Sequence, residues 1–365
     1  MLPPTRYGAS VGRITGEASL LDRLHRFKLH ETGDGKEESN TLKDLCLKVL
    51  TDNFESIATM DKRSAALPMQ QIALITSRLR TDLSPIIAGE RVNNENYWKR
   101  RSLEKYGWSQ CHLIDHGMRW KQLFFEKMLQ ENLEECDGLE MSVEEIKLLV
   151  ETCYDSIFTV RFRQLLSHIP LHKLCASAKN MRTLDACYGV IKVGMQYDRM
   201  LFGLKISDAT SLSKVFEQAD NLTTVILSRN IIDDDLLRLL MVGLLKNNTI
   251  THLNLSHNKI TDFGTHLLTK LLQEGSVLTT LDLSDNLIQQ EGGRHLGREL
   301  RTNDSLQRLD LRLNRLADEG CREVLDAVAS NTALTHLNLS SNGAHENVSS
   351  IQDYKALLLI LFTHK

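Results

Sequence analysis

The carboxy-terminal half of the chain carries five copies of one nine-residue phrase, spaced 28 residues apart. Each copy begins with leucine or isoleucine, has apolar residues three and five positions later, and closes on an asparagine. The closing asparagines are Asn230, Asn258, Asn286, Asn314 and Asn342. A constant interval of this length indicates that each copy is one structural unit that stacks on the next.

This phrase, L-x-x-L-x-L-x-x-N, is the leucine-rich-repeat motif, and it predicts one short strand in each copy. In the copy from Ile250 to Asn258, alternation turns Leu253 and Leu255 inward and their neighbours outward. One strand cannot bury its apolar side alone, so the copies should stack as a parallel sheet with a helix behind each strand. The expected fold class is therefore α/β, a horseshoe of 28-residue, ribonuclease-inhibitor-like repeats over residues 222–342.

The five repeat asparagines are expected to be structural rather than chemical. The chain turns sharply after each strand, and its backbone groups would otherwise be buried without partners. An amide side chain offers both donors and an acceptor. We therefore predict that the stacked asparagines form a hydrogen-bonded ladder along the turns.

The period continues upstream in a degenerate form. A strand phrase is predicted from Leu166 to Leu174, and Leu174 and then Phe202 take the place of the ladder asparagine. Solenoids need atypical terminal units that shield their open ends. We therefore expect capping repeats over 166–221, and an atypical tail over 343–365 that is either a poor cap or a variant terminus.

The amino-terminal half is expected to be mainly α-helical. Residues 1–40 end in a stretch rich in glycine and charge and are predicted to be a flexible segment. Residues 41–165 carry apolar stripes at helical spacing and predict a helical domain before the repeats. Within it, Trp98 and Arg100 are candidates for partner binding, because aromatic rings beside cations bind partners well. The alternative is that these aromatic residues form the core of the domain.

The outward residues of the repeat strands form the main candidate surface for binding a partner. Repeat register places them on the inner, sheet-lined face, together with serines such as Ser256 and Ser284. The change from acidic to basic residues along this face is a charge contrast suited to orienting a partner. The candidates are His252, Asn254, Asp282, Arg308, Asp310, Arg312 and His336.

The chain shows no catalytic signature, so an enzyme is not expected. Phosphate-binding loops, the nucleophile elbow and the zinc-protease motif do not occur in it. Two groups with ligand-like spacing, in 168–175 and 111–116, do not supply the four ligands of a structural zinc site. No metal or other cofactor is predicted.

Composition limits the classes of partner and the cellular compartment that we expect for this protein. A net charge of −3 argues against the concentrated basic face that nucleic acid requires. The longest apolar run, residues 356–362, is far shorter than the roughly 20 residues of a membrane span. The seven dispersed cysteines are typical of reduced thiols. We expect a cytoplasmic protein that binds neither nucleic acid nor membrane.

Several segments together carry a resemblance to a known family. They are Tyr97-Trp98-Lys-Arg, the region of Trp108 and Trp120, Met200-Leu-Phe-Gly-Leu204 and the repeats. In these the chain resembles the T-complex-associated testis-expressed proteins, the leucine-rich-repeat (fifth) subunit family of the nexin–dynein regulatory complex. The resemblance implies a non-enzymatic scaffold of the ciliary and flagellar axoneme that helps to regulate dynein-driven motility, including sperm motility. It implies as partners the other subunits of the complex, doublet microtubules and inner-arm dynein.

Two other functions stay open at this point. Leu67-Pro68, the apolar residues up to Leu79, and Trp98 faintly match an F-box placed before leucine-rich repeats, which would indicate a substrate adaptor of a ubiquitin ligase. A GTPase-activating leucine-rich-repeat protein would instead need an arginine or asparagine at the nucleotide. Arginines that could take that role are Arg229, Arg308 and Arg312.

Overall fold

The chain divides into two compact units, 1–50 and 51–365. The computed structural model describes residues 42–55, 69–136, 140–165, 169–190 and 202–345. Helix α2 (Leu42–Asp52) spans the boundary between the two units. The predicted flexible segment, 1–40, lies outside the described residues.

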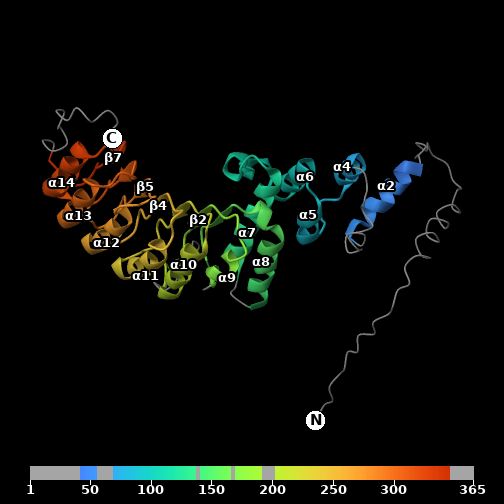
Figure 1. Cartoon of the computed structure of the whole chain (residues 1–365). Helices are drawn as coiled ribbons and strands as arrows, with labels where there is room; N and C mark the ends of the chain where they lie inside the picture. Colours follow the sequence, from blue (N-terminus) through green and yellow to red (C-terminus); the bar gives the residue numbers. More distant parts are fainter. Residues whose placement is uncertain (1–41, 56–68, 137–139, 166–168, 191–201, 346–365) are drawn as a thin grey trace, which may run out of the picture. The chain divides into compact units, whose positions relative to one another are not determined.

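The second unit begins with a helical region (Figure 1). Its helices are α4 (Met69–Arg78), α5 (Pro85–Arg91), α6 (Glu95–Tyr106), α7 (Trp120–Glu135) and α8 (Glu140–Cys153), with 3-10 turns η2 (Trp108–Gln110), η3 (Leu113–His116) and η4 (Tyr154–Ser156). Local chemistry explains two of the starts. Pro85 opens α5, where its missing N–H would have had no helical partner. The side chain of Asn94 caps α6 by accepting hydrogen bonds from the backbone N–H groups of Asn96 and Tyr97.

Seven parallel strands follow, paired in the order of the chain. They are β1 (Thr159–Phe162), β2 (Thr183–Ala186), β3 (Thr224–Ile226), β4 (His252–Asn254), β5 (Thr280–Asp282), β6 (Arg308–Asp310) and β7 (His336–Asn338). From β3 onward, residues 28 positions apart are direct partners, as in the pair His252 and Thr280. The predicted leucine-rich-repeat sheet is confirmed.

A helix or 3-10 turn lies behind almost every strand, and together these elements cover one face of the sheet (Figure 1). They are α9 (Leu171–Cys175), α10 (Ile206–Gln218), α11 (Asp234–Leu244), α12 (Asp262–Leu268), η6 (Thr269–Leu272), α13 (Gln290–Leu300) and α14 (Ala317–Ser330). The inward residues Leu253 and Leu255 are buried between sheet and helices. Glycine permits the closest approach: a Cβ on Gly293 of α13 would lie 2.7 Å from the Cα of Gly320 in α14.

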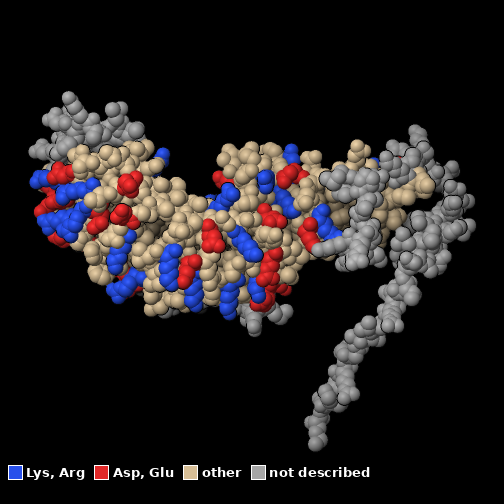
Figure 2. Space-filling view, viewed as in Figure 1, with Lys and Arg blue, Asp and Glu red and all other residues tan. Residues whose placement is uncertain are grey.

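The outer surface of these helices is charged but mixed. Figure 2 shows positive and negative side chains interspersed over the repeat helices. Some of them pair between neighbouring repeats, such as Lys246 with Glu217 at 2.7 Å and Arg294 with Glu319. Exposed pairs of this kind contribute little to stability. They give a solvated outer surface without a large field of one sign.

The turns after the strands are held by the predicted asparagine ladder. Asn258 Oδ1 accepts hydrogen bonds from the backbone N–H groups of Asn230 and Ile232, both at 3.0 Å. Its Nδ2 donates to the carbonyls of Leu227 at 3.0 Å and Leu255 at 2.9 Å. Each amide therefore joins its own turn to the turn of the preceding repeat. The same donor pattern recurs at Asn286, Asn314 and Asn342.

The residue before each ladder asparagine has a left-handed backbone conformation. The φ angles lie between 53° and 61° at Arg229, His257, Asp285, Leu313 and Ser341. This conformation costs a residue with a side chain roughly 1–2 kcal/mol. The hydrogen bonds of the asparagines hold the turns in this shape.

The strand phrase expected from Leu166 to Leu174 is wrong. Residues 171–175 form helix α9, and the first two strands lie at 159–162 and 183–186. Pro170 has no N–H to donate to a strand ladder but suits the start of a helix. The buried Leu171 and Leu174 are three positions apart, a spacing that serves a helix as well as the repeat phrase.

The first edge of the sheet is shielded by helix α7. Glu126 Oε1 accepts hydrogen bonds from the backbone N–H groups of Phe158 at 2.9 Å and Thr159 at 2.8 Å. Glu134 Oε1 accepts one from Arg163 at 2.8 Å. Two carboxylates on one helix thus replace a missing strand along β1. The described parts of 166–221, predicted as capping repeats, form α9, β2 and α10 next to this covered edge.

One contact typical of the repeats lies past residue 343, where the sequence predicts that the tail begins. The backbone N–H of His345 donates to Asp318 at 2.6 Å, as Gln289 does to Asp262 at 2.6 Å one repeat earlier. The repeat geometry therefore continues through residue 345. The rest of the tail, 346–365, lies outside the described residues.

We predict that Asn286→Ala lowers the free energy of unfolding by about 1–3 kcal/mol, because it leaves buried backbone groups without partners. The groups concerned are the N–H of Ile260 and the carbonyls of Leu255 and Leu283. Chemical denaturation followed by circular dichroism measures the change. Asn248→Ala, at an exposed position, is the matched control and should have no effect. An unchanged midpoint for Asn286→Ala would remove the ladder role.

Candidate functional site

The concave face of the repeat sheet brings the predicted residues together in rows. In the first row, His252, Arg308 and His336 lie on strands β4, β6 and β7, with Thr280 between them on β5. In the second row, Asn254, Asp282, Asp310 and Asn338 occupy four consecutive strands. Parallel pairing in register is what turns a period along the chain into a row across the sheet.

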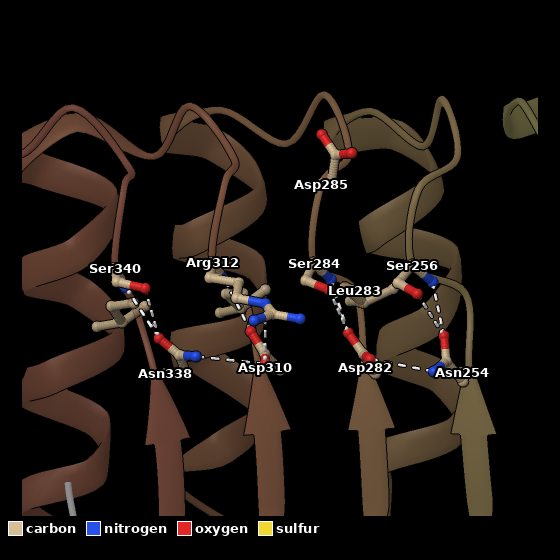
Figure 3. A network of polar contacts seen from close by, with 12 residues as sticks. Asn254, Ser256, Asp282, Leu283, Ser284, Asp285, Asp310, Arg312, Asn338 and Ser340 are labelled. Carbon is tan, nitrogen blue, oxygen red and sulfur yellow. Dashed lines mark hydrogen bonds and ion pairs between the residues drawn. The ribbon is translucent and has the colours of Figure 1, made fainter. Parts of the chain in front are cut away.

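The second row carries an ordered polar network (Figure 3). Asn254 Nδ2 donates to Asp282 Oδ2 at 3.1 Å, and Asn338 Nδ2 donates to Asp310 Oδ2 at 3.3 Å. The two aspartates are direct strand partners. Two carboxylates therefore lie side by side, each held from its outer side by an amide.

This arrangement perturbs the charge of the central pair. Partial burial raises the pKa of Asp310 above its usual value, and the neighbouring charge of Asp282 adds to this rise. The backbone N–H of Arg312, which donates to Asp310 at 3.0 Å, acts in the opposite direction. The guanidinium of Arg312 lies 3.5 Å from the same carboxylate and is half exposed. The face therefore changes from acidic to basic within one repeat.

The two histidines of the first row are oriented by the residues before them. The hydroxyl of Thr251 hydrogen-bonds to His252 Nδ1 at 2.8 Å, and Thr335 does the same for His336 at 2.8 Å. Histidine, arginine, aspartate and asparagine together make a surface of hydrogen-bond donors and acceptors. This arrangement is suited to recognising another protein surface.

The expectation that Ser256 and Ser284 lie on the open face is wrong, because both are buried. The hydroxyl of Ser256 donates to Asn254 Oδ1 at 2.7 Å, and that of Ser284 donates to Asp282 Oδ1 at 2.7 Å. These serines follow the second row at the ends of the strands, and their hydroxyl and backbone N–H groups donate to it (Figure 3). The open face is correspondingly narrower than the sequence predicts.

Trp98 is not available to a partner, and its prediction as a binding residue is wrong. Its side chain is 0% exposed, and its ring centroid lies 5.2 Å from that of Phe124 and 4.9 Å from that of Phe125. Its Nε1 donates to the carbonyl of Val92 at 2.8 Å. Arg100 is exposed, but it donates to the carbonyl of Leu79 at 3.1 Å and so ties α6 to the end of α4. The core interpretation holds for Trp98.

The exposed tryptophan is Trp108, which the sequence did not distinguish from the others. It is 70% exposed, and its ring lies 6.2 Å from that of Trp120. The amine of Lys99 lies 5.8 Å from both rings. The helix boundary is the signal that separates them: Trp98 is on the buried face of α6, whereas Trp108 follows the residue Gly107 that ends it.

One histidine in each of the two ligand-like groups has another partner. His116 pairs with the buried Glu126, and His172 Nδ1 hydrogen-bonds to the hydroxyl of Ser211 at 3.0 Å. His168 lies outside the described residues. Within the described ranges, no three potential metal ligands come together. Among the helices that the structure describes, none is both long and apolar enough to cross a membrane.

Fold and surface together define a leucine-rich-repeat protein with a helical amino-terminal region and a polar concave face. A family model described as leucine-rich repeat matches residues 246–264, 276–297 and 302–325. The chain is 42% identical over 199 residues to dynein regulatory complex subunit 5 of Chlamydomonas reinhardtii, covering 54% of this chain and 50% of that protein. It is 28% identical over 241 residues to the subunits of that name in Mus musculus and Homo sapiens, covering 58% of this chain and 47% of each.

These relatives confirm the resemblance stated from the sequence. The chain spans about half the length of the curated relatives it matches. Among solved structures, the actin-binding site 2 of leiomodin-1 has a TM-score of 0.34 and 21% identity, covering 39% of this chain and 81% of that chain. An internalin from Listeria monocytogenes has a TM-score of 0.30 and 18% identity, covering 60% of this chain and 70% of that chain.

The two tryptophans should differ sharply in their effect on stability. Trp98→Ala is expected to lower the free energy of unfolding by about 3–5 kcal/mol, because it empties a packed aromatic core. Trp108→Ala is expected to change it by less than about 0.5 kcal/mol, because most of that side chain already contacts solvent. Urea denaturation of both variants measures the difference. Equal effects would contradict the assignment of Trp98 to the core.

The raised pKa of Asp310 gives a pH-dependent prediction. A carboxyl whose pKa is raised on folding destabilises the folded protein where it is charged, so Asp310→Asn should stabilise the protein at neutral pH. The new amide can donate to Asp282 but gives up the oxygen that accepts from Asn338, so the gain should stay below about 1 kcal/mol, the size of one net hydrogen bond. The part of the gain that comes from charge should vanish as pH falls below the usual aspartate pKa. Thermal melts across pH, with the exposed Asp304→Asn as control, test this.

Proposed function

We propose that this protein is a non-enzymatic scaffold subunit of the dynein regulatory complex in the axoneme of cilia and flagella. In this role it would help to regulate dynein-driven motility, including sperm motility, as part of the cytoskeleton within the cytoplasm. The 42% identity to the Chlamydomonas subunit is the observation that carries the proposal. Its partners would be the other subunits of the complex, together with doublet microtubules and inner-arm dynein.

The physical properties of the repeats support this role. Each repeat is bound to the next by strand pairing, by helix packing and by an asparagine amide. A stack of this kind presents one stiff, continuous surface, on which several neighbours can be held at fixed spacing. A scaffold between moving structures needs such stiffness because its partners must keep their relative positions.

Within this role, we assign partner contact to the concave face from β4 to β7. The acidic pair Asp282 and Asp310 lies beside the basic side chains of Arg308 and Arg312. Adjacent patches of opposite sign orient an approaching partner and reject surfaces of the wrong charge pattern. His252, Asn254 and His336 would add hydrogen bonds at the margins of this patch.

The two alternative functions are not favoured. The four curated relatives all bear the name dynein regulatory complex subunit 5, and that name denotes neither a ubiquitin-ligase adaptor nor a GTPase activator. The F-box match used Leu79 and Trp98, which are buried inside the helical region of this chain. Of the arginines considered for GTPase activation, Arg312 is paired with Asp310.

The test uses a flagellate that lacks its own copy of this subunit. The full chain is expressed with a tag, and its retention on demembranated axonemes is followed by immunoblotting during extraction with rising salt. We expect the wild-type chain to stay with the doublets. Release together with the soluble matrix proteins would contradict the scaffold role.

A charge-reversed variant tests the concave face separately. Arg308→Glu combined with Arg312→Glu should be released at clearly lower salt than the wild-type chain, because reversal places like charges against the partner. Lys270→Glu, on the outer surface at η6, is the matched control. Equal retention of the two variants would show that the partner contacts another part of the chain. This outcome would contradict the assignment of the concave face but not the scaffold role.

A further inference from the structure

A hollow of about 320 Å³ lies between the turns η2 and η3, helix α7 and the first strand β1. Its basic lining residues come from two of these elements: Lys127 from α7, and Arg161 and Arg163 from β1 and the residue after it. His112, between the two turns, also lines it. The hollow uses no residue of strands β4–β7 and is therefore distinct from the partner face proposed above.

The two arginines of this hollow share one carboxylate. Arg161 Nε donates to Asp185 Oδ2 at 3.0 Å, and Arg163 Nη1 donates to Asp185 Oδ1 at 3.2 Å. Asp185 is buried, whereas Arg163 is half exposed and Arg161 is partly exposed. Two guanidinium groups against one carboxylate leave an excess positive charge. They also leave N–H donors that Asp185 does not accept.

The remaining charged groups of the lining are one amine, that of Lys127, and two carboxylates, those of Glu126 and Asp115, so the positive surplus is confined to the arginine pair and this amine. The amine of Lys127 lies 4.9 Å from the centre of the Tyr106 ring, and it forms no ion pair with any residue that the structure describes. Glu126 also lines the hollow, but its carboxylate is buried and accepts the N–H groups of Phe158 and Thr159 in addition to pairing with His116. The other acidic group of the lining is the exposed Asp115.

We propose that this hollow binds an acidic segment of a partner protein, with an aspartate or glutamate side chain placed between Lys127 and the arginine pair. A guanidinium presents parallel N–H donors that match the two oxygens of a carboxylate, and the lysine supplies a third charge-assisted donor. Every residue of the lining carries a polar group, so the segment is held by charge and hydrogen bonds.

The experiment uses the full chain and two synthetic peptides. One is a fluorescein-labelled twelve-residue peptide of alternating glutamate and alanine, and the other has glutamine in place of glutamate. Fluorescence anisotropy at low salt should detect binding of the glutamate peptide and at least tenfold weaker binding of the glutamine peptide. Equal binding of the two peptides would overturn the proposal.

Two variants place the binding in this hollow. Lys127→Gln and Arg161→Gln should each weaken binding of the glutamate peptide about tenfold, the effect of losing one charge-assisted hydrogen bond. Lys270→Gln, on the outer surface, is the control for loss of one positive charge and should bind as the wild type does. Thermal melts check folding. Arg161→Gln removes a hydrogen bond to the buried Asp185 and could disturb the fold. Lys127→Gln leaves the contacts of Asp185 intact, so it tests binding alone.

A competition arm distinguishes a peptide carboxylate from a small anion. Inorganic phosphate at millimolar concentration should displace little of the peptide, because a small ion cannot contact the lysine and both arginines in the way an extended segment can. Complete displacement would overturn the peptide assignment in favour of an anion site. Unchanged peptide binding in both Lys127→Gln and Arg161→Gln would show that the acidic segment binds elsewhere.

Discussion

The hydrogen bonds of the repeat asparagines are the interaction on which the rest of this structure depends. At every turn the chain buries backbone groups that water cannot reach, and one amide satisfies groups in its own repeat and in the preceding one. These hydrogen bonds fix the position of each turn relative to the turn of the preceding repeat. The left-handed residue before each asparagine persists because these bonds outweigh its conformational cost.

Fixed stacking has a direct consequence for the surface. Because the strands pair in register, residues 28 positions apart in the chain become neighbours in space. Asp282 and Asp310 are brought side by side in this way, and Arg308 and Arg312 follow within the same repeat. At the start of the sheet, α7 closes the edge with Glu126 and Glu134. Beside this covered edge lies the hollow lined by Lys127, Arg161 and Arg163, where we propose that an acidic segment binds.

Much of the repeat region could be predicted from its residues, because strand, turn and helix signals recur there at one interval. The prediction was wrong at Leu166 to Leu174, where the same apolar spacing suits a strand or a helix and Pro170 decides for the helix. It was also wrong for Trp98. The sequence around the tryptophans does not show which ring is buried, because basic residues flank Trp98 and Trp120 alike. Only the packing of α6 against α7 shows that Trp98 lies in the core and that Trp108 is exposed.

The amino-acid sequence by itself determined the class of fold, the register of the sheet from β3 to β7 and the role of the asparagines. These features repeat within one period and rest on local chemistry, so they can be predicted from short stretches. Only the tertiary structure decided which helix shields β1, which tryptophan is exposed and where positive charge lacks a partner. These depend on contacts such as those of Glu126 with Thr159 and Arg161 with Asp185, between residues far apart in the chain, and no local pattern encodes them.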